Sequence, residues 1–121
     1  MHGPMTIQAT DFFAALSHDT RLRTLMLLVQ HDELCVCELT HAIGVSQPHL
    51  SRHLAQLREL GVVADRRAGL WVYYRVNPSL PTWAHLVLKD IDAGLRTQKP
   101  FVDDVKGLAA MPNRPDSPRC A

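Results

Sequence analysis

The sequence predicts a mostly α-helical domain that carries one β-hairpin. Three observations support this fold class. Apolar residues recur at three- and four-residue spacing in several segments, which is the period of an amphipathic helix. Between residues 62 and 76 the period changes to two, which is typical of strands. The length of 121 residues corresponds to a single domain, which we place at residues 1–99.

Composition excludes several classes of protein. Apolar residues make up 46% and charged residues 21% of the chain, which is ordinary for a globular domain. No apolar run approaches the ~20 residues that span a bilayer, and residues 1–10 lack the layout of a signal peptide. We therefore expect a cytoplasmic protein without a membrane partner. Three cysteines do not make a disulfide framework, so reduced thiols that bind a metal or react fit better.

Two amphipathic helices are predicted at the start of the domain. The first covers residues 9–16, and the second runs to about residue 30. Ser17 or Asp19 is expected to cap the second helix, because either side chain can accept a hydrogen bond from a first-turn N–H. The apolar positions are Ala9, Phe12, Phe13 and Leu16 in the first helix, and Leu22, Leu25, Met26 and Val29 in the second.

The next two elements are predicted to form a helix-turn-helix unit. A short helix is expected at residues 38–43, and Gly44 interrupts it. Ser46 is a good N-cap for the following helix, Pro48 is tolerated in its first turn, and Gly61 ends it. A short helix, a glycine-containing turn and a longer helix are the parts of this unit.

A β-hairpin and a last helix complete the predicted domain. Residues 62–67 and 70–76 flank Ala68-Gly69, a pair suited to a tight turn, and a hairpin in this place makes a winged helix-turn-helix. Residues 100–121 contain glycine and proline with few bulky residues after Leu108, so we expect a flexible C-terminal tail. The last helix follows Pro81, with one apolar stripe of Ala84, Val87, Leu88, Ile91 and Leu95.

Charge and polarity indicate that the middle third of the chain binds double-stranded DNA. Residues 46–75 carry five arginines against two acidic residues, although the whole chain has a formal charge of only +1. Small polar side chains and an arginine at a helix N-terminus suit the major groove, and arginines beside a hairpin turn suit phosphates or the minor groove. Alternatively, these side chains only form a solvated surface. The candidate DNA contacts are Ser46, Gln47, His49, Ser51 and Arg52 on the helix, and Arg66 and Arg67 on the hairpin.

A homodimer is expected, because a monomer of this size reads few base pairs and a dimer matches a palindrome. The first and last helices carry more apolar surface than one small core needs. Alternatively, both helices complete the core of the monomer. The candidate interface residues are Phe12, Phe13, Trp83, Leu86 and Leu88.

The segment ELCVCEL at residues 33–39 is a candidate metal site, because thiolates select soft ions. If Cys35 and Cys37 were both helical, their side chains would point roughly 200° apart. One ion could then hold both sulfurs only where the turn leaves helical geometry. Binding would distort the helix-turn-helix and lower DNA affinity. The alternative is that both cysteines are small buried apolar residues.

Four segments resemble the ArsR/SmtB family of metal-responsive repressors. They are ALSHDTRLR at 15–23, ELCVCEL at 33–39, SQPHLSRHL at 46–54 and VYYRV at 72–76, and the resemblance covers about residues 9–96. The second segment is similar to the signature of the arsenical-resistance repressors. The resemblance implies a homodimeric repressor of an arsenic-detoxification operon that leaves its operator when As(III) or Sb(III) binds Cys35 and Cys37, with no organic cofactor.

A third ligand is left open. Some members of the family carry a cysteine three residues after the pair, where this chain has Thr40. Trigonal As(III) takes three ligands, and Cys120 is the one other thiol of the chain. The segment from residue 100 to Cys120 can extend at most ~70 Å, which does not exclude either subunit's site. Glutathione or water could serve instead.

Other functions were weighed against this one. A Cd/Pb/Zn-sensing repressor of the same fold could combine the thiols with His31 or His41. A redox-sensing regulator would oxidise the thiols, although a disulfide within C-x-C closes a cramped ring. An enzyme is not expected, because the sequence offers no base and orienting group for a nucleophilic thiol.

Overall fold

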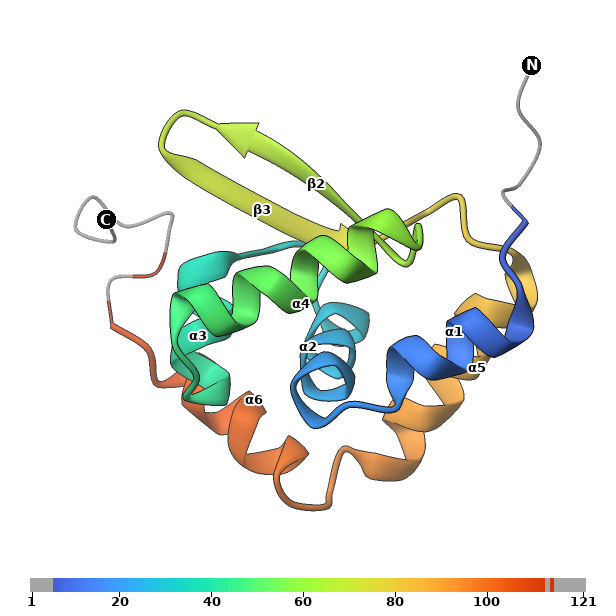
Figure 1. Ribbon diagram of the computed structural model, residues 1–121. Helices are drawn as coiled ribbons and strands as arrows, with labels where there is room; N and C mark the ends of the chain where they lie inside the picture. The colour runs from blue at the N-terminus through green and yellow to red at the C-terminus, as the bar shows by residue number, and fades with distance from the viewer. Residues whose placement is uncertain (1–5, 113, 115–121) are drawn as a thin grey trace.

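The computed structural model describes residues 6–112 and 114 of the chain. Figure 1 shows helices packed around α2, with a β-hairpin projecting from one side. The elements are α1 (Ala9–Leu16), α2 (Asp19–Gln30), β1 (Leu34–Cys35), α3 (Val36–Ile43), α4 (Gln47–Glu59), β2 (Val63–Ala68), β3 (Trp71–Val76), α5 (Thr82–Leu95) and α6 (Phe101–Ala109). This order confirms the mostly α-helical class with a hairpin after a helix-turn-helix.

The core is built from the apolar stripes of these helices. Helix α2 contacts every other helix and the strand β3, so its buried face is the centre of the core. None of the helices in the described part of the chain has the length and apolar character needed to cross a membrane. The largest fully buried side chains include Phe12, Leu25, Leu27, Leu39, Leu50, Leu54, Leu57 and Leu88.

Gly44, Ser46 and Gly61 set the ends of the helix-turn-helix as predicted. Gly44 ends α3 at φ 80°, a left-handed conformation that glycine adopts without strain. The Ser46 hydroxyl accepts a hydrogen bond from the His49 N–H at 3.3 Å and caps α4. The prediction for α2 was wrong, since its cap is neither Ser17 nor Asp19: His18 Nδ1 accepts from the Thr20 N–H at 3.2 Å. A histidine ring nitrogen replaces the usual oxygen here.

A third strand, which the sequence pattern did not reveal, pairs with the hairpin. Strands β2 and β3 pair antiparallel with Ala68 opposite Trp71, so Gly69 and Leu70 form the turn. Strand β1 pairs with the other edge of β3, where Cys35 lies opposite Tyr73, and the sheet order is β1-β3-β2. A two-residue strand is too short to show alternation. Its consequence is that the cysteine segment is joined directly to the wing.

The segment after Pro100 differs from the predicted flexible tail. Residues 101–109 form α6, which packs against α2 and α3. Asp104 is buried and accepts hydrogen bonds from Arg23 Nε at 2.9 Å and Nη2 at 2.6 Å. The Arg23 guanidinium also donates to the Ile43 carbonyl at 3.2 Å. The positions of α6 that face the core have helical spacing: Phe101, Asp104, Val105 and Leu108. Because Asp104 is charged, a search for apolar residues alone does not detect the stripe. Residues 113 and 115–121 of the predicted tail, which include Cys120, lie outside the described residues.

Candidate functional site

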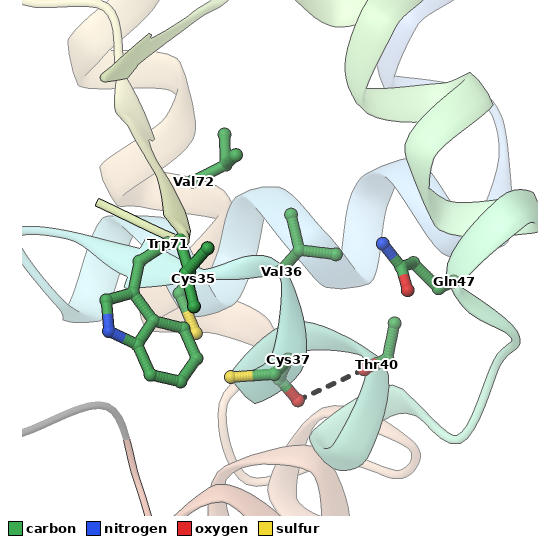
Figure 2. Close-up of a pocket in the computed structure, with 8 residues that line it drawn as sticks. Cys35, Val36, Cys37, Thr40, Gln47, Trp71 and Val72 are labelled. Atoms are coloured by element: carbon green, nitrogen blue, oxygen red, sulfur yellow. Dashed lines mark hydrogen bonds between the residues drawn. The ribbon is translucent and has the colours of Figure 1, made fainter. Parts of the chain in front are cut away.

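The two cysteines of the ELCVCEL segment lie together at the start of α3. Cys35 ends β1 and is the N-cap of α3, with extended backbone at φ −85° and ψ 164°. Cys37 lies in the first turn of the helix, and its side chain is hydrogen-bonded to the Cys35 thiol. Figure 2 shows both sulfur atoms on the same side, beside the Trp71 ring. The sequence argument expected the two side chains to point apart only if both residues were helical, and the extended backbone at Cys35 removes that condition. One ion can therefore contact both sulfurs without unwinding α3.

The environment of Cys35 keeps its thiol protonated. Burial raises the pKa of Cys35, because an apolar surrounding disfavours the thiolate. Hydrogen bonds with the Cys37 side chain and with the Glu38 backbone N–H oppose this shift, and the Glu38 charge adds to it. Both cysteines are reduced rather than joined in a disulfide. A soft ion that binds here has to displace a proton from Cys35.

Glu38 and Arg114 support the Cys35 backbone. Glu38 is buried, and its Oε1 accepts the Cys35 N–H at 2.9 Å, which completes a capping box. Its other oxygen, Oε2, accepts from Arg114 Nε at 2.7 Å. Sequence reasoning missed both residues. A glutamate three positions after the N-cap is the signal that could have identified Glu38, whereas nothing local indicates Arg114.

A cavity of about 220 Å³ opens beside the thiols. It lies between the start of α3, the start of α4 and the tip of the wing (Figure 2). Thr40 lines it, and its hydroxyl donates to the Cys37 carbonyl at 3.1 Å. The cavity thus brings the thiols next to both elements that were predicted to contact DNA. Its lining residues are Cys35, Val36, Cys37, Thr40, Gln47, Leu70, Trp71 and Val72.

None of the histidines that the structure describes joins the thiols in a group of metal-ligating side chains. No group of three His, Cys, Asp or Glu side chains suitable for a metal ion occurs within residues 6–112 and 114. His31 lies at the C-terminal end of α2, where its Nδ1 is 3.0 Å from the Leu27 carbonyl oxygen. His41 is exposed in the last turn of α3. The described residues therefore offer a two-thiol site.

Most of the polar side chains predicted to contact bases are exposed on α4. Ser46, Gln47, Ser51 and Arg52 are all exposed. His49 differs, because it is half-buried and its Nε2 is 3.1 Å from the Thr20 hydroxyl oxygen. His49 therefore joins α4 to α2 in this structure.

Three histidine rings, one from the N-cap of α2 and two from α4, form one cluster. The His18 and His53 ring centroids are 4.1 Å apart, and those of His49 and His53 are 4.8 Å apart. Burial lowers the pKa of His53, and the nearby charges of His18, His49, Arg21 and Arg52 lower it further. Its Nδ1 is buried without a hydrogen-bond partner in the described structure. The cluster packs α4 against the start of α2, and its surroundings disfavour the charged form of His53.

The two arginines of β2 that were predicted to contact DNA are not equivalent. Arg66 donates to both oxygens of Glu33 at 2.6 and 2.7 Å, and its guanidinium carbon is 4.6 Å from the centroid of the Tyr73 ring. Arg67 is exposed and has no carboxylate partner among the residues that the structure describes. Alternation along β2 places the two side chains on opposite faces of the sheet. Of these two arginines, Arg67 is therefore the one available to a phosphate.

The proposed dimer surface divides into core and exposed residues. Phe12 and Leu88 are 0% and 1% exposed, so both belong to the core of the monomer, and the expectation that they form a surface was wrong. The apolar stripe of an amphipathic helix includes positions buried in its own core as well as exposed positions. Residue spacing alone does not distinguish the two. Phe13, Trp83 and Leu86 remain 50%, 39% and 54% exposed. The Phe13 and Trp83 rings stack with centroids 6.5 Å apart, which joins α1 and α5 in one apolar patch.

Comparison with known proteins gives a consistent result. Residues 18–65 match the family described as "Bacterial regulatory protein, arsR family". The arsenic resistance transcriptional regulator ArsR1 of Pseudomonas putida is 51% identical over 107 residues, which cover 88% of this chain and 81% of that protein. The arsenical resistance operon repressor of Escherichia coli is 47% identical over 80 residues, or 66% and 68% of the two chains. Among solved structures, HlyU of Vibrio cholerae superposes with a TM-score of 0.65 at 30% identity, covering 72% of this chain and 90% of that one.

Proposed function

The chain belongs to the ArsR family of bacterial regulatory proteins, and on this basis we propose that it is a metalloid-responsive repressor. It is a DNA-binding transcription regulator with a winged helix-turn-helix fold and not an enzyme. In the proposed cycle a homodimer binds operator DNA upstream of an arsenical-resistance operon. As(III) or Sb(III) then binds Cys35 and Cys37, and the repressor dissociates.

The observation that carries this proposal is the position of the thiol pair. The cavity that contains both sulfurs is also lined by Gln47 of α4 and by Leu70 to Val72 of the wing. An ion bound there contacts or displaces α4 and the wing, the two elements proposed to meet DNA. The affinity of the site for the ion therefore depends on how these two elements are placed. Linkage of this kind typically amounts to about 1–3 kcal/mol, or about 5- to 150-fold in affinity.

The proposed release does not require α3 to unwind. Cys35 is paired with β3 through Tyr73, and the Glu33 carboxylate holds Arg66 of β2. A shift of the cysteine segment toward a bound ion is therefore transmitted to both strands of the wing. We propose that this movement of the wing relative to α4 lowers the affinity for DNA.

Cys120 is proposed as the third ligand of inorganic As(III). Support comes from Arg114, whose ion pair with Glu38 holds that residue beside the start of α3. From there to Cys120 the chain can extend about 20 Å, which is ample for either thiol of the pair. Glutathione or water would take the same position if Cys120 does not.

The proposal is tested by fluorescence anisotropy of the reduced protein on its own upstream DNA. Arsenite, antimonite, Cd(II) and Zn(II) are titrated into the wild type and into Cys35→Ser, Cys37→Ser and Cys120→Ser. Release of the wild type by arsenite and antimonite, with Cys35→Ser and Cys37→Ser still bound to DNA, supports the proposal. Loss of DNA binding itself in Cys35→Ser would indicate a structural role for the thiol.

The other arms of the experiment separate the alternatives. Release by the divalent ions alone would move the inducer to the Cd/Pb/Zn class. Unchanged arsenite release in Cys120→Ser would remove Cys120 as a required ligand and leave the paired thiols as the sensor.

A further inference from the structure

A three-way junction joins α6, α2 and the turn of the helix-turn-helix. Arg23 of α2 donates from Nε and Nη2 to the two carboxylate oxygens of Asp104 on α6, at 2.9 and 2.6 Å. The same Nη2 also donates to the Ile43 carbonyl at 3.2 Å. Ile43 is the last residue of α3, and the final carbonyls of a helix lack an intrahelical partner. One guanidinium thus connects α6 to the residue at which the turn begins.

Asp104 sets the direction of this guanidinium. The Asp104 carboxylate is buried, and two parallel hydrogen bonds from a planar guanidinium to a carboxylate fix the orientation of both groups. Asp19 is the other carboxylate bonded to Arg23, at 3.2 Å, but its side chain is 68% exposed. A water-exposed ion pair of this kind orients its arginine weakly. The contact of Arg23 with Ile43 therefore depends on the docking of α6.

Helix α6 lies away from the elements proposed to meet DNA. Figure 1 shows α6 beside α3, on the side opposite to the hairpin. The two helices approach closely, since a Cβ added at Gly107 would lie 3.5 Å from the Ala42 carbonyl oxygen, and Leu108 is buried between the elements of the core. An effect of α6 on DNA binding would therefore pass through α3 and the turn rather than through a contact with DNA.

We propose that Arg23 and Asp104 are positioning residues for operator binding, because through them the docking of α6 sets the angle between α3 and α4. The turn at residues 44–46 is short, and Ser46 within it caps α4, so a displacement of Ile43 shifts the start of α4. Base contacts come from the N-terminal part of such a helix, and hydrogen bonds tolerate little change in distance or direction. The inference rests on the operator binding of the proposed function and is independent of the inducer.

The test compares the same substitution at two neighbouring positions of α6. Asp104→Asn removes the charge that directs Arg23 and keeps the size of the side chain. Asp103→Asn is the matched control, because Asp103 lies in the same first turn but its side chain is 54% exposed. Each variant removes one negative charge, which by itself favours binding to the DNA polyanion. A weaker affinity of Asp104→Asn is therefore opposite to the effect of charge.

A third variant, Arg23→Lys, keeps the net charge of the protein. Lysine can approach Asp104, but it lacks the planar fork that bonds Asp104 and Ile43 at the same time. It also tests the junction if Asp104→Asn does not fold. Fluorescence anisotropy measures the affinity of each full-length variant for its own upstream DNA and for a random duplex of equal length. Circular dichroism identifies a temperature at which the variants are fully folded, so that a loss of stability does not enter the affinity.

The expected result is a loss of operator affinity without a matching loss on random DNA. Asp104→Asn and Arg23→Lys should weaken operator binding by about 3- to 30-fold, the range typical of substitutions that act through a coupled element. Asp103→Asn should bind as tightly as the wild type or slightly more tightly. An operator affinity of both junction variants equal to that of Asp103→Asn, or equal losses on the two duplexes, would overturn the inference.

Amide hydrogen exchange on the free protein separates this inference from the proposed function. The Gly44 N–H donates to the Thr40 carbonyl at 2.9 Å, beside the junction. Exchange at residues 44–46 should be faster in Asp104→Asn than in Asp103→Asn, whereas amides in the middle of α5 should exchange alike. Equal exchange at the turn would overturn the inference. If the wild type does not prefer its upstream DNA, the proposed function fails, and the exchange result still decides whether Asp104 holds the turn.

Discussion

At the scale of single residues, the capping box of α3 determines the chemistry of the thiol site. Glu38 holds the Cys35 N–H with one carboxylate oxygen and Arg114 with the other. Its negative charge acts in the direction that raises the pKa of Cys35. The side-chain charge of Glu38 therefore disfavours ionisation of the thiol while its backbone N–H favours it, and Arg114 compensates part of that buried charge.

Replacing Glu38→Gln is expected to shift ionisation of Cys35 to lower pH. The amide oxygen can still accept the Cys35 N–H, but the charge that raises the pKa of the thiol is removed. The measurement is the ultraviolet absorbance of the thiolate as a function of pH, in a Cys37→Ser, Cys120→Ser background so that one thiol is observed. An unchanged or higher pKa would show that the charge of Glu38 does not reach the thiol.

Arg114→Ala is expected to lose about 1–2 kcal/mol of stability, because it leaves the buried Glu38 carboxylate without its cation. The loss is limited because the pair is partly exposed on the arginine side.

Arg52 is expected to read a base. Its side chain is exposed in the middle of α4 and has no carboxylate partner within the described residues. Arg52→Ala should weaken binding to the operator by about 1–3 kcal/mol, since a bidentate arginine–guanine contact has that value, and should affect random duplex much less. Anisotropy titrations on both duplexes measure this difference. Equal losses on both would refute a base-reading role.

At the scale of elements, the histidine cluster makes the joint between α2 and α4 sensitive to pH. The pKa of His53 is lowered by burial, so the folded state binds a proton at this site less readily than the unfolded chain. The contribution of His53 to the free energy of unfolding is complete above the pKa of histidine in the unfolded chain, about 6.5. It is lost as the pH falls from there through the lowered folded value, since the unfolded state then binds more protons.

The corresponding prediction concerns the free energy of unfolding from pH 8 to pH 5. The wild type should become less stable toward the acid end, and His53→Gln should make that decline shallower. Urea denaturation at several pH values measures both. His31→Gln is the matched control, because His31 lies outside the cluster and should leave the slope unchanged. A wild-type curve without an acid-side decline would contradict the argument.

The wing provides a second comparison at this scale. Arg67→Ala should weaken binding to specific and random DNA alike and reduce the slope of log affinity against log salt by about 1, as expected for one lost phosphate contact. Arg66→Ala should have a smaller effect, because its guanidinium is already paired with Glu33 and stacked on Tyr73. The two substitutions remove the same charge from neighbouring positions. An equal effect of both would show that Arg66 leaves Glu33 when DNA binds.

At the scale of the whole molecule, the exposed apolar patch of α1 and α5 is the surface best suited to a second copy. Phe13, Trp83 and Leu86 are all exposed, and the first two rings stack on each other. Apolar patches that join two elements in this way are typical of interaction surfaces. The homodimer of the proposed function is expected to form here.

Leu86→Glu is expected to give a folded monomer with weakened operator binding. Leu86 is 54% exposed, so the charge is tolerated in the monomer but not in an apolar interface. Sedimentation equilibrium measures the mass, and circular dichroism checks the fold. Leu88→Ala, on the same helix but 1% exposed, should instead lower stability by about 2–5 kcal/mol. A Leu86→Glu protein that remains dimeric would place the interface elsewhere.

Much of this protein was determined by local sequence. Helix periods, Gly44, Ser46, Gly61 and the turn beside Gly69 specify the helix-turn-helix and the wing, because each acts on the backbone within a few residues. The exposed α4 residues Gln47, Ser51 and Arg52 could be identified in the same way. The cysteine pair was also recognisable, since residue type and spacing alone suggest a soft ligand site.

Tertiary structure decided what depends on distant partners. Strand β1 exists because β3 pairs with it, and this pairing gives Cys35 the extended backbone that lets the two sulfurs meet. Helix α6 docks because Asp104 finds Arg23 across the fold. Phe12 and Leu88 became core residues, His49 turned toward Thr20, and Arg66 paired with Glu33. In each case a side chain had two plausible environments, and only the packing of elements remote in sequence selects between burial, pairing and exposure.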